Sequence, residues 1–523
     1  MQLSRRFTPL HLLLLSINGM IGSAWLFAPL YAAKLAGGGA IIAWLLGGAA
    51  TIIIALTFAE VSALLPLAGG TTRVAELTQG SLTGFIISWI TWLSCVTMPP
   101  IEVQAVLQYA ATHFTSLTHM VNGMPVLSST GLGFALVIML SLCIINVASF
   151  RGLIGFNLLL FGFKVLVMIL TCAMLMHTHF HTENFALAHF DSLGWKGILA
   201  AVASGGIAFA FTGFKHGVEL AGEAKHTHIT IPLAVVGSVV CCLILYIGLQ
   251  VAFIGALSPA HLSAGWAKLS FSGDVGPFVG LAGFLGLFWL VKLLYVDAVV
   301  SPLGAGLIYV TSTARIIYAM SKNGYLADKF ALLNKAHFPI WAIGLNFIVG
   351  CLLFLPLPGW QTMVSFLVSA VVISYAMGPI ALLCLRKQIP EVKRPFYLPG
   401  AKLLCPLAFY CCNLISYWTG WETLSKLAMA LALGLAILGL ACWRGRIDKQ
   451  RFGFKSLWWL LPYLMGLMLI SYLGSFGGKG LITFGWDFLL IAIFSWIILA
   501  LAIRFRQSHI VELYQDYQTT NIS

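Results

Sequence analysis

The chain has 523 residues, of which 60% are hydrophobic and only 9% are charged, with a mean hydropathy of +0.96 and a formal charge of +13. Soluble globular proteins carry about 25% charged residues. The composition therefore excludes a soluble globular protein and predicts an all-α polytopic membrane protein. An outer-membrane barrel would show short alternating segments in place of the long apolar runs found here.

Apolar runs recur along the whole chain and predict about 14 (12–14) transmembrane helices. In chain order they are expected at residues 9–33, 38–65, 82–112, 129–149, 152–176, 197–221, 231–257, 278–317, 339–356, 361–385, 404–419, 424–443, 457–474 and 484–503. The loops between these runs are too short to hold a soluble domain.

Basic residues are distributed unevenly over the two sides of this predicted bundle. Twenty Lys and Arg residues fall in loops on the side that holds both termini, and five fall on the other side, namely Lys34, Lys196, Lys268, Lys426 and Lys479. By the positive-inside rule, both termini are cytoplasmic. The positive charge is thus explained by membrane topology, and no nucleic-acid partner is expected.

A charged, proline-rich segment, RKQIPEVKRPFYLPG at 386–400, suggests how the chain is organised. We expect a core of ten helices at 1–386, a cytoplasmic loop at 387–403, peripheral transmembrane helices at 404–506 and a cytoplasmic tail at 507–523.

Two of the expected spans contain poor helix formers in their middle. They are INGMIGSAWLFAP at 17–29 and SGGIAFAFTGFKHGVELAGEAK at 204–225, in the first and sixth spans. These are equivalent positions in two five-helix halves, and paired breaks of this kind predict a midplane binding site in an inverted-repeat transporter. Close packing of glycines between helices is the alternative for either segment taken alone.

The same segments resemble a known family. GMIGSAWLFAP is similar to the first-helix signature of the amino acid–polyamine–organocation (APC) superfamily permeases, and FAFTGFKHGVELAGEAKHTHITIPLAV at 209–235 to their sixth-helix signature. Later elements follow in the family's order, in SPLGAGLIYVTSTARIIYAMSKNGYLADKF at 301–330, YAMGPIALLCLR and RPFYLPG. The bacterial aspartate/proton symporter branch is the most similar. The resemblance implies a LeuT-like 5+5 inverted repeat with discontinuous helices 1 and 6, in the bacterial plasma (inner) membrane.

An unwound helix leaves backbone groups without partners, which is tolerable only where they face a cavity. Amides around Met20–Ala24 can hold a carboxylate, and carbonyls around Phe211–Gly213 can take an ammonium, so that together they fit an α-amino acid. The expected substrate-binding residues are Met20, Ile21, Gly22, Ser23, Ala24, Phe209, Phe211, Thr212, Gly213 and Lys215. The resemblance places Phe209 at an aromatic lid, and core packing is the alternative for it.

The chain departs from the family pattern at three places. Ala24 stands where relatives have a third glycine, KHTHITIP replaces K-N-P-x-x-x-I-P, and Lys215 stands where relatives often have an acid. Lys215 lies near the N-terminal end of a half-helix, where the dipole disfavours a cation. An acidic substrate side chain, Glu219 one turn on, and Glu102 in the third span are its candidate partners.

Lys164 is about 12 residues from either end of its span, hence roughly 18 Å deep and too far in to snorkel. A buried ammonium is costly unless it is solvated or paired. The resemblance implies that Lys164 takes and releases a coupled proton and bridges the first and eighth helices when charged; a purely structural pairing with carbonyls is the alternative. Glu102 is the second candidate for proton coupling, and Asp297 and Lys292 have no assigned role.

The expected function is proton-coupled symport for amino acid uptake, with acidic amino acids such as aspartate or glutamate as substrates. Small neutral amino acids also fit a backbone clamp, and an amino acid or polyamine exchanger and a non-transporting amino acid sensor remain alternatives. No enzyme is expected, since the chain lacks H-E-x-x-H, G-x-S-x-G and P-loop patterns. HTHFH at 177–181 lies in an expected loop without a cysteine companion, so no metal or cofactor is expected. The expected partners are substrate, protons and the bilayer, and the oligomeric state stays open.

Overall fold

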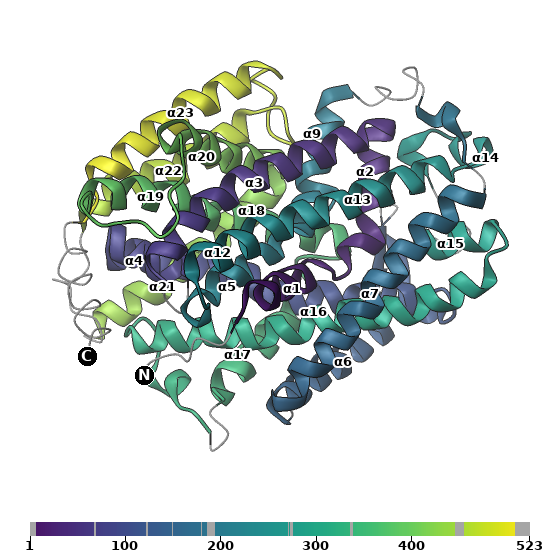
Figure 1. Ribbon diagram of the computed structural model, residues 1–523, viewed down its shortest axis with the longest axis horizontal. Coiled ribbons are helices and arrows are strands. Elements are labelled where there is room, and N and C mark those ends of the chain that lie inside the picture. The colour runs from purple at the N-terminus through teal and green to yellow at the C-terminus, as the bar shows by residue number, and fades with distance from the viewer. Residues whose placement is uncertain are drawn as a thin grey trace.

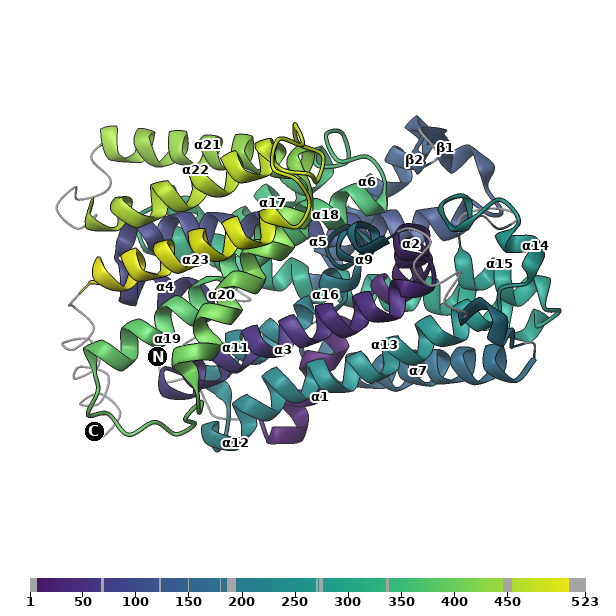
Figure 2. The ribbon, with the colours of Figure 1, turned by 90° about the horizontal axis from the view of Figure 1, so that it is seen from above.

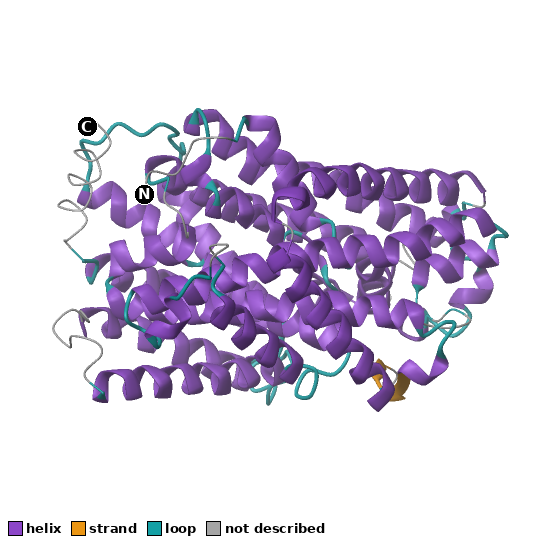
Figure 3. Ribbon diagram, turned by 90° about the horizontal axis from the view of Figure 1, so that it is seen from below, coloured by secondary structure: helices purple, strands orange, loops and turns teal. Residues whose placement is uncertain are grey.

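The computed structural model describes residues 7–66, 70–121, 124–148, 150–178, 180–185, 194–269, 271, 276–334, 338–444 and 454–507. These residues form a bundle of helices (Figures 1 and 3). The only strands among them, β1 (Thr118–Val121) and β2 (Met124–Leu127), pair as an antiparallel hairpin at the rim of the bundle (Figure 3). The prediction of helices is confirmed for the bundle, and the hairpin is a feature that an all-α prediction misses.

The first half of the chain contains α1 (Pro9–Met20), α2 (Ala24–Ala36), α3 (Ala40–Leu64), α4 (Gly70–Gln79), α5 (Ser81–Ala110), α6 (Ser129–Ala148), α7 (Phe150–Thr178), α9 (Gly194–Ser204), α10 (Ile207–Ala210), α11 (Lys215–Glu219), α12 (Thr227–Pro232), α13 (Ser238–Gly255) and α14 (Pro259–Leu262). The second half contains α15 (Pro277–Phe284), α16 (Phe288–Lys322), α17 (Ile340–Leu352), α18 (Trp360–Tyr375), α19 (Met377–Gln388), α20 (Ala401–Trp418), α21 (Trp421–Trp443), α22 (Leu457–Leu473) and α23 (Trp486–Arg504).

Two expected spans are each divided into two helices. The run at 278–317 begins with α15, which ends at Phe284 and is followed by Gly286 (φ +73), and the Leu287 N–H then bonds back to the Ala282 carbonyl. This geometry closes a helix C-terminus and needs a glycine. The run at 361–385 is interrupted at Ala376, between α18 and α19, because Pro379 has no N–H to donate to the Tyr375 carbonyl.

Nine helices among the described residues are long and apolar enough to cross a membrane, or ten if the bent pair Gly194–Ala210 and Thr212–Glu219 is one span. Three further apolar helices, α1, α17 and α22, are shorter. A polytopic membrane protein is therefore confirmed, and the total of fourteen spans stays a prediction.

The centre of the bundle is formed by α5 and by α18 with α19. In each of these two apolar segments, 94% of the most apolar window is buried, against 28% for α6, α7 and α21. The latter helices expose apolar side chains over much of their surface, as helices in contact with lipid do. The C-terminal α22 and α23 lie at one edge of the bundle (Figures 1 and 2), where α23 packs on α20, which itself packs on α3.

A buried carboxylate fastens the segment after α19 to α3. Glu60 accepts from Arg386 at 2.6 Å and from the Leu398 N–H at 2.7 Å, and its other oxygen lies 3.0 Å from Arg394 Nε. Because Glu60 is fully buried, its charge needs both guanidinium groups. The expected loop at 387–403 is thus folded against the bundle. Apart from Gln507, the expected tail at 507–523 lies outside the described residues.

Candidate functional site

The break expected in the first span is present. The α1 helix ends at Met20, Ile21 leaves helical geometry (φ −87, ψ 85), and α2 starts at Ala24. The two glycines that flank Ile21 cannot be replaced without a clash. A Cβ at Gly22 would lie 2.5 Å from Glu102 Oε1, and a Cβ at Gly19 would collide with the His216 ring.

The second break lies between α10 and α11. The helical axis bends by 40° between Gly194–Ala210 and Thr212–Glu219. A Cβ on Gly213 would collide with the backbone of Gly19 and Met20. The two interrupted segments, almost two hundred residues apart in the sequence, therefore touch backbone to backbone.

Tyrosines from two other helices donate hydrogen bonds to backbone carbonyls at the two breaks. The Tyr246 hydroxyl, on α13, donates to the Met20 carbonyl at 2.9 Å, and the Tyr375 hydroxyl, at the end of α18, donates to the Thr212 carbonyl at 3.0 Å. All of these groups are buried. The sequence analysis missed both tyrosines, since an aromatic residue in an apolar span gives no signal that separates it from packing.

Lys164 lies where it was expected, at the first break. Its ammonium, on α7, donates to the Ile21 carbonyl at 3.0 Å and to Asn18 Oδ1 at 3.3 Å, and the side chain is 1% exposed. A Cβ on Gly304 of α16 would lie 3.1 Å from Nζ. Lys164 thus lies between the first helix and α16, as predicted, and its part in proton coupling stays a prediction.

Glu102 contacts the first break from α5. Its Oε2 accepts the Ser23 N–H at 2.8 Å, while the Trp360 indole, on α18, donates to Ser23 Oγ at 2.9 Å. Pairing of Glu102 with Lys215 is not what the structure shows. Lys215 contacts Cys95, which precedes Glu102 by about two turns, or roughly 10 Å along α5.

The start of α2 remains available for an anion. Ser23 makes no side-chain capping bond, and the N–H groups of Ala24 and Trp25 have no acceptor among the residues that the structure describes. Free amides at a helix N-terminus favour a negative group. Ala24 has 1% of its surface exposed, so the backbone here is closely surrounded.

Lys215 forms an ion pair, which was one of the alternatives for it. Its Nζ lies 3.3 Å from Glu219 Oε1, one turn along α11, and 2.9 Å from Cys95 Sγ. The charge of Lys215 is therefore balanced by Glu219 within the same helix. This pairing allows a cation at the N-terminal end of α11, where the helix dipole alone would disfavour it. A contact between Lys215 and a substrate stays a prediction.

The expected aromatic residues pack in layers around the second break. Phe209 meets Trp360 edge to face at 5.8 Å, and Phe211 lies edge-on to both Trp44 and Tyr246 at 5.8 Å. Thr212, whose hydroxyl donates to the Phe209 carbonyl at 2.8 Å, closes the turn between the two half-helices. These contacts pack aromatic rings from α3, α13 and α18 against the second break.

His216 is a site neighbour that the sequence analysis did not single out. Its ring lies 5.1 Å from that of Tyr309 on α16, and its Nδ1 lies 3.7 Å from Glu219 Oε2. His216 Nε2 and the Tyr309 hydroxyl have no hydrogen-bond partner among the described residues. Its place beside Lys215 in the sequence was the only available signal.

The remaining charged candidates lie apart from one another. Asp297 is buried and accepts from Ser301 at 2.9 Å, whereas Lys292 on the same helix is exposed. In the histidine-rich segment, His181 contacts Glu183 at 2.8 Å. The described residues contain no group of three potential metal ligands, and His179 lies outside them.

Comparison with known proteins identifies the family. The sequence profile of the family described as "Amino acid permease" matches residues 7–437, most of the chain. The chain belongs to the amino acid permease family. This permease is 36% identical over 516 residues to the glutamate/serine transporter AimA of Bacillus subtilis, covering 96% of this chain and 94% of the relative.

Two further relatives come from the same organism. The aspartate-proton symporter is 36% identical over 486 residues, covering 92% of this chain and 93% of the relative. The branched-chain amino acid permease BcaP is 25% identical over 452 residues, covering 83% and 92%. With many apolar helices, the permease is a multi-pass protein of the bacterial plasma membrane, and it is a transporter and no enzyme.

We predict that Gly213→Ala abolishes substrate binding and transport, because the added methyl group would force the two breaks apart. Gly344→Ala on α17 is the matched control, since a Cβ there meets nothing within 4 Å. Both variants should be compared with the wild type for uptake by whole cells and for membrane expression. Wild-type uptake by a well-expressed Gly213→Ala protein would contradict the close contact between the breaks.

Proposed function

We propose that this permease takes up amino acids by proton-coupled symport and prefers acidic amino acids such as aspartate or glutamate. The substrate class and proton coupling are supported by the two relatives at 36% identity, a glutamate/serine transporter and an aspartate-proton symporter. The single observation that carries the mechanism is the buried Lys164 ammonium on the Ile21 carbonyl of the first break.

We propose a LeuT-like arrangement of two inverted five-helix repeats for residues 1–386, followed by the loop at 387–403 and peripheral helices at 404–506. Twelve to fourteen spans would then place both termini in the cytoplasm, in agreement with the positive-inside distribution of Lys and Arg. The contact of the two breaks through Gly213 supports this arrangement, because inverted-repeat transporters place both interrupted helices at one site.

In this proposal, the substrate lies between the two breaks. Its α-carboxylate binds the free N–H groups of Ala24 and Trp25 at the start of α2, and its α-ammonium binds at the end of α10, near Phe211. The positive N-terminus of one half-helix and the negative C-terminus of the other match the two charges of an amino acid. Phe209 and Trp360 cover the site from one side.

Proton coupling follows from the position of Glu102. Its carboxylate already accepts the Ser23 N–H, so an arriving substrate carboxylate would bring a second negative charge to the same helix start. Two carboxylates at one site repel each other unless one is protonated. A proton on Glu102 therefore enters together with the substrate.

Lys164 would pass the proton on by a relay, in which its ammonium first releases its own proton and the neutral amine then takes the proton from Glu102. Lys164 and Glu102 hold neighbouring backbone groups of the first break, the Ile21 carbonyl and the Ser23 N–H. A charged Lys164 holds the Ile21 carbonyl by a charge-assisted bond, which weakens when the proton leaves. Release of the proton to the cytoplasm thus loosens the break and lets the substrate leave on the same side.

We predict that Lys164→Ala uncouples transport. Proteoliposomes with wild-type permease should accumulate labelled aspartate when the outside is made acidic, whereas the variant should lose at least about tenfold of that accumulation because its break has no titratable tether. Lys292→Ala, which removes an exposed lysine of α16, is the control and should behave as the wild type. Undiminished, pH-dependent accumulation by Lys164→Ala would refute the proposal.

We predict that Lys215→Glu lowers uptake of aspartate relative to serine by about tenfold or more, because the change replaces a cation near the substrate by an anion. Lys215→Arg keeps the charge and should keep the preference. Competition between the two labelled amino acids in cells measures the ratio. A ratio that stays the same in Lys215→Glu would remove Lys215 from substrate recognition.

A further inference from the structure

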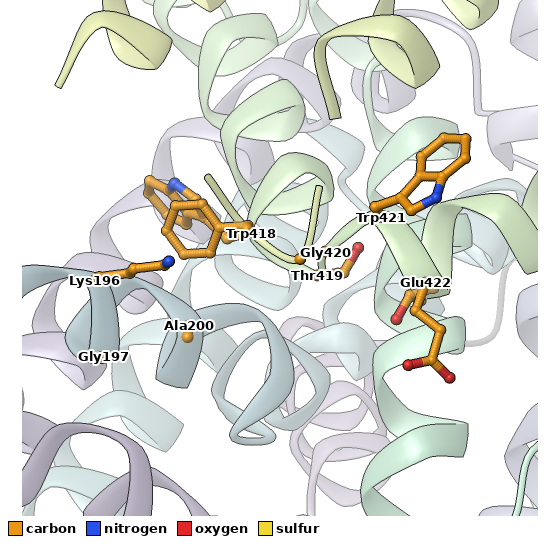
Figure 4. Close-up of a pocket in the computed structure, with 11 residues that line it drawn as sticks. Lys196, Gly197, Ala200, Trp418, Thr419, Gly420, Trp421 and Glu422 are labelled. Carbon is orange, nitrogen blue, oxygen red and sulfur yellow. The ribbon is translucent and has the colours of Figure 1, made fainter. Parts of the chain in front are cut away.

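A pocket lies where α20 ends, and no residue of the two breaks lines it. The α20 helix begins at Ala401, close to the Glu60 cluster, and is 18 residues long, ending at Trp418, which lines the pocket. The pocket has a volume of about 480 Å³ and lies between the start of α9, the α20–α21 link and the loop after α22 (Figure 4). In the proposed topology this is the outer end of the bundle.

One wall of the pocket carries a free cation. Lys196, on the first turn of α9, is exposed, and its ammonium lies 5.6 Å from the ring centre of Phe476. No carboxylate lies within 4 Å of this ammonium among the described residues. The ammonium of Lys196 lies over an aromatic ring and has no counter-ion within the residues that the structure describes, so it is able to bind an anionic group.

The start of α21 adds hydrogen-bond donors to the same pocket. Gly420 is its N-cap residue (φ 89) and gives no side-chain cap, and the N–H groups of Glu422 and Thr423 have no acceptor in the described part of the chain. The Trp418 indole N–H also lacks an acceptor there, although the side chain is only 8% exposed. These donors favour an anion in the pocket that Lys196 also lines.

The opposite wall carries a carboxylate. In Figure 4, Lys196 and Glu422 lie on opposite sides of the link formed by Thr419 and Gly420. Glu422 is 83% exposed, and only its Oε1 is paired, with Lys426 at 2.9 Å. A cation on one wall and a carboxylate on the other match a ligand that carries both charges.

We propose that this pocket binds the phosphoethanolamine headgroup of a phospholipid, with its phosphate at Lys196 and the start of α21 and its primary ammonium at Glu422. The surroundings favour a lipid over a free zwitterion. Trp418, Trp421 and Phe476 line the pocket, and tryptophan gathers where membrane and water meet. Apolar side chains exposed along α21, such as Met429 and Leu433, offer a surface for the acyl chains.

Headgroup binding would connect α9 to the α20–α21 link. The α9 helix leads directly into the bent segment of the second break, so its position affects the substrate site. This consequence for transport rests on the proposed function, whereas the binding itself does not. A binding assay therefore tests the inference separately from symport.

The test uses the full chain, purified and delipidated in detergent, with native mass spectrometry to measure binding of dioctanoyl phosphatidylethanolamine and dioctanoyl phosphatidylglycerol. The wild type should bind the ethanolamine lipid more tightly. Lys196→Gln should weaken both lipids about tenfold, and Glu422→Gln should remove the preference while leaving phosphatidylglycerol bound. Lys268→Gln, an exposed lysine outside the pocket, is the control and should bind as the wild type.

Unchanged lipid binding in Lys196→Gln, or equal binding of the two lipids by the wild type, would overturn the assignment. Soluble phosphoethanolamine and serine serve as further probes. If either soluble compound competes as well as the lipid does at equal concentration, the pocket binds a free zwitterion, and the assignment to a phospholipid is wrong. Failure of these tests leaves the transport experiments with Lys164→Ala unaffected, because those experiments measure a different site.

Discussion

Unpaired backbone groups inside an apolar bundle are the constraint on which this structure depends. Each carbonyl or N–H freed by a helix break must find a partner, because no water is available in hydrocarbon. Here Lys164, Tyr246 and Tyr375 satisfy carbonyls, and Glu102 satisfies an amide. Four helices that are remote in sequence thus converge on two short segments, which fixes their positions in the centre of the bundle.

The same constraint explains why the site can respond to substrate and protons. The groups that satisfy the breaks are themselves hydroxyls, an ammonium and a carboxylate, so an amino acid can replace some of them with its own charges. Two of them change charge with a proton. In the proposed mechanism, substrate binding at the breaks is linked to the charges of Lys164 and Glu102 through the hydrogen bonds that these two side chains make there. A transporter needs such a link to couple two gradients.

The sequence allowed both breaks, the place of Lys164 and the helical segments to be predicted, because glycines, buried charge and apolar runs leave strong local signals. It did not allow the partners of those groups to be predicted. Pairing with Lys215 was one of two alternatives for Glu102, the other being proton coupling, and Glu102 instead contacts Ser23, since only the packing of α5 decides which break it faces. Trp360, Tyr246 and His216 were missed for the same reason, as their role depends on contacts between helices and not on local pattern.

The central claim is that a proton joins Glu102 when the substrate carboxylate arrives. Isothermal titration calorimetry of aspartate binding to the purified permease, in two buffers of different ionisation enthalpy, measures proton uptake directly. The account predicts uptake of about one proton per bound aspartate in the wild type, and none in Glu102→Gln, which keeps an acceptor for the Ser23 N–H but cannot titrate. Binding without proton uptake in the wild type, or equal uptake in Glu102→Gln, would contradict it.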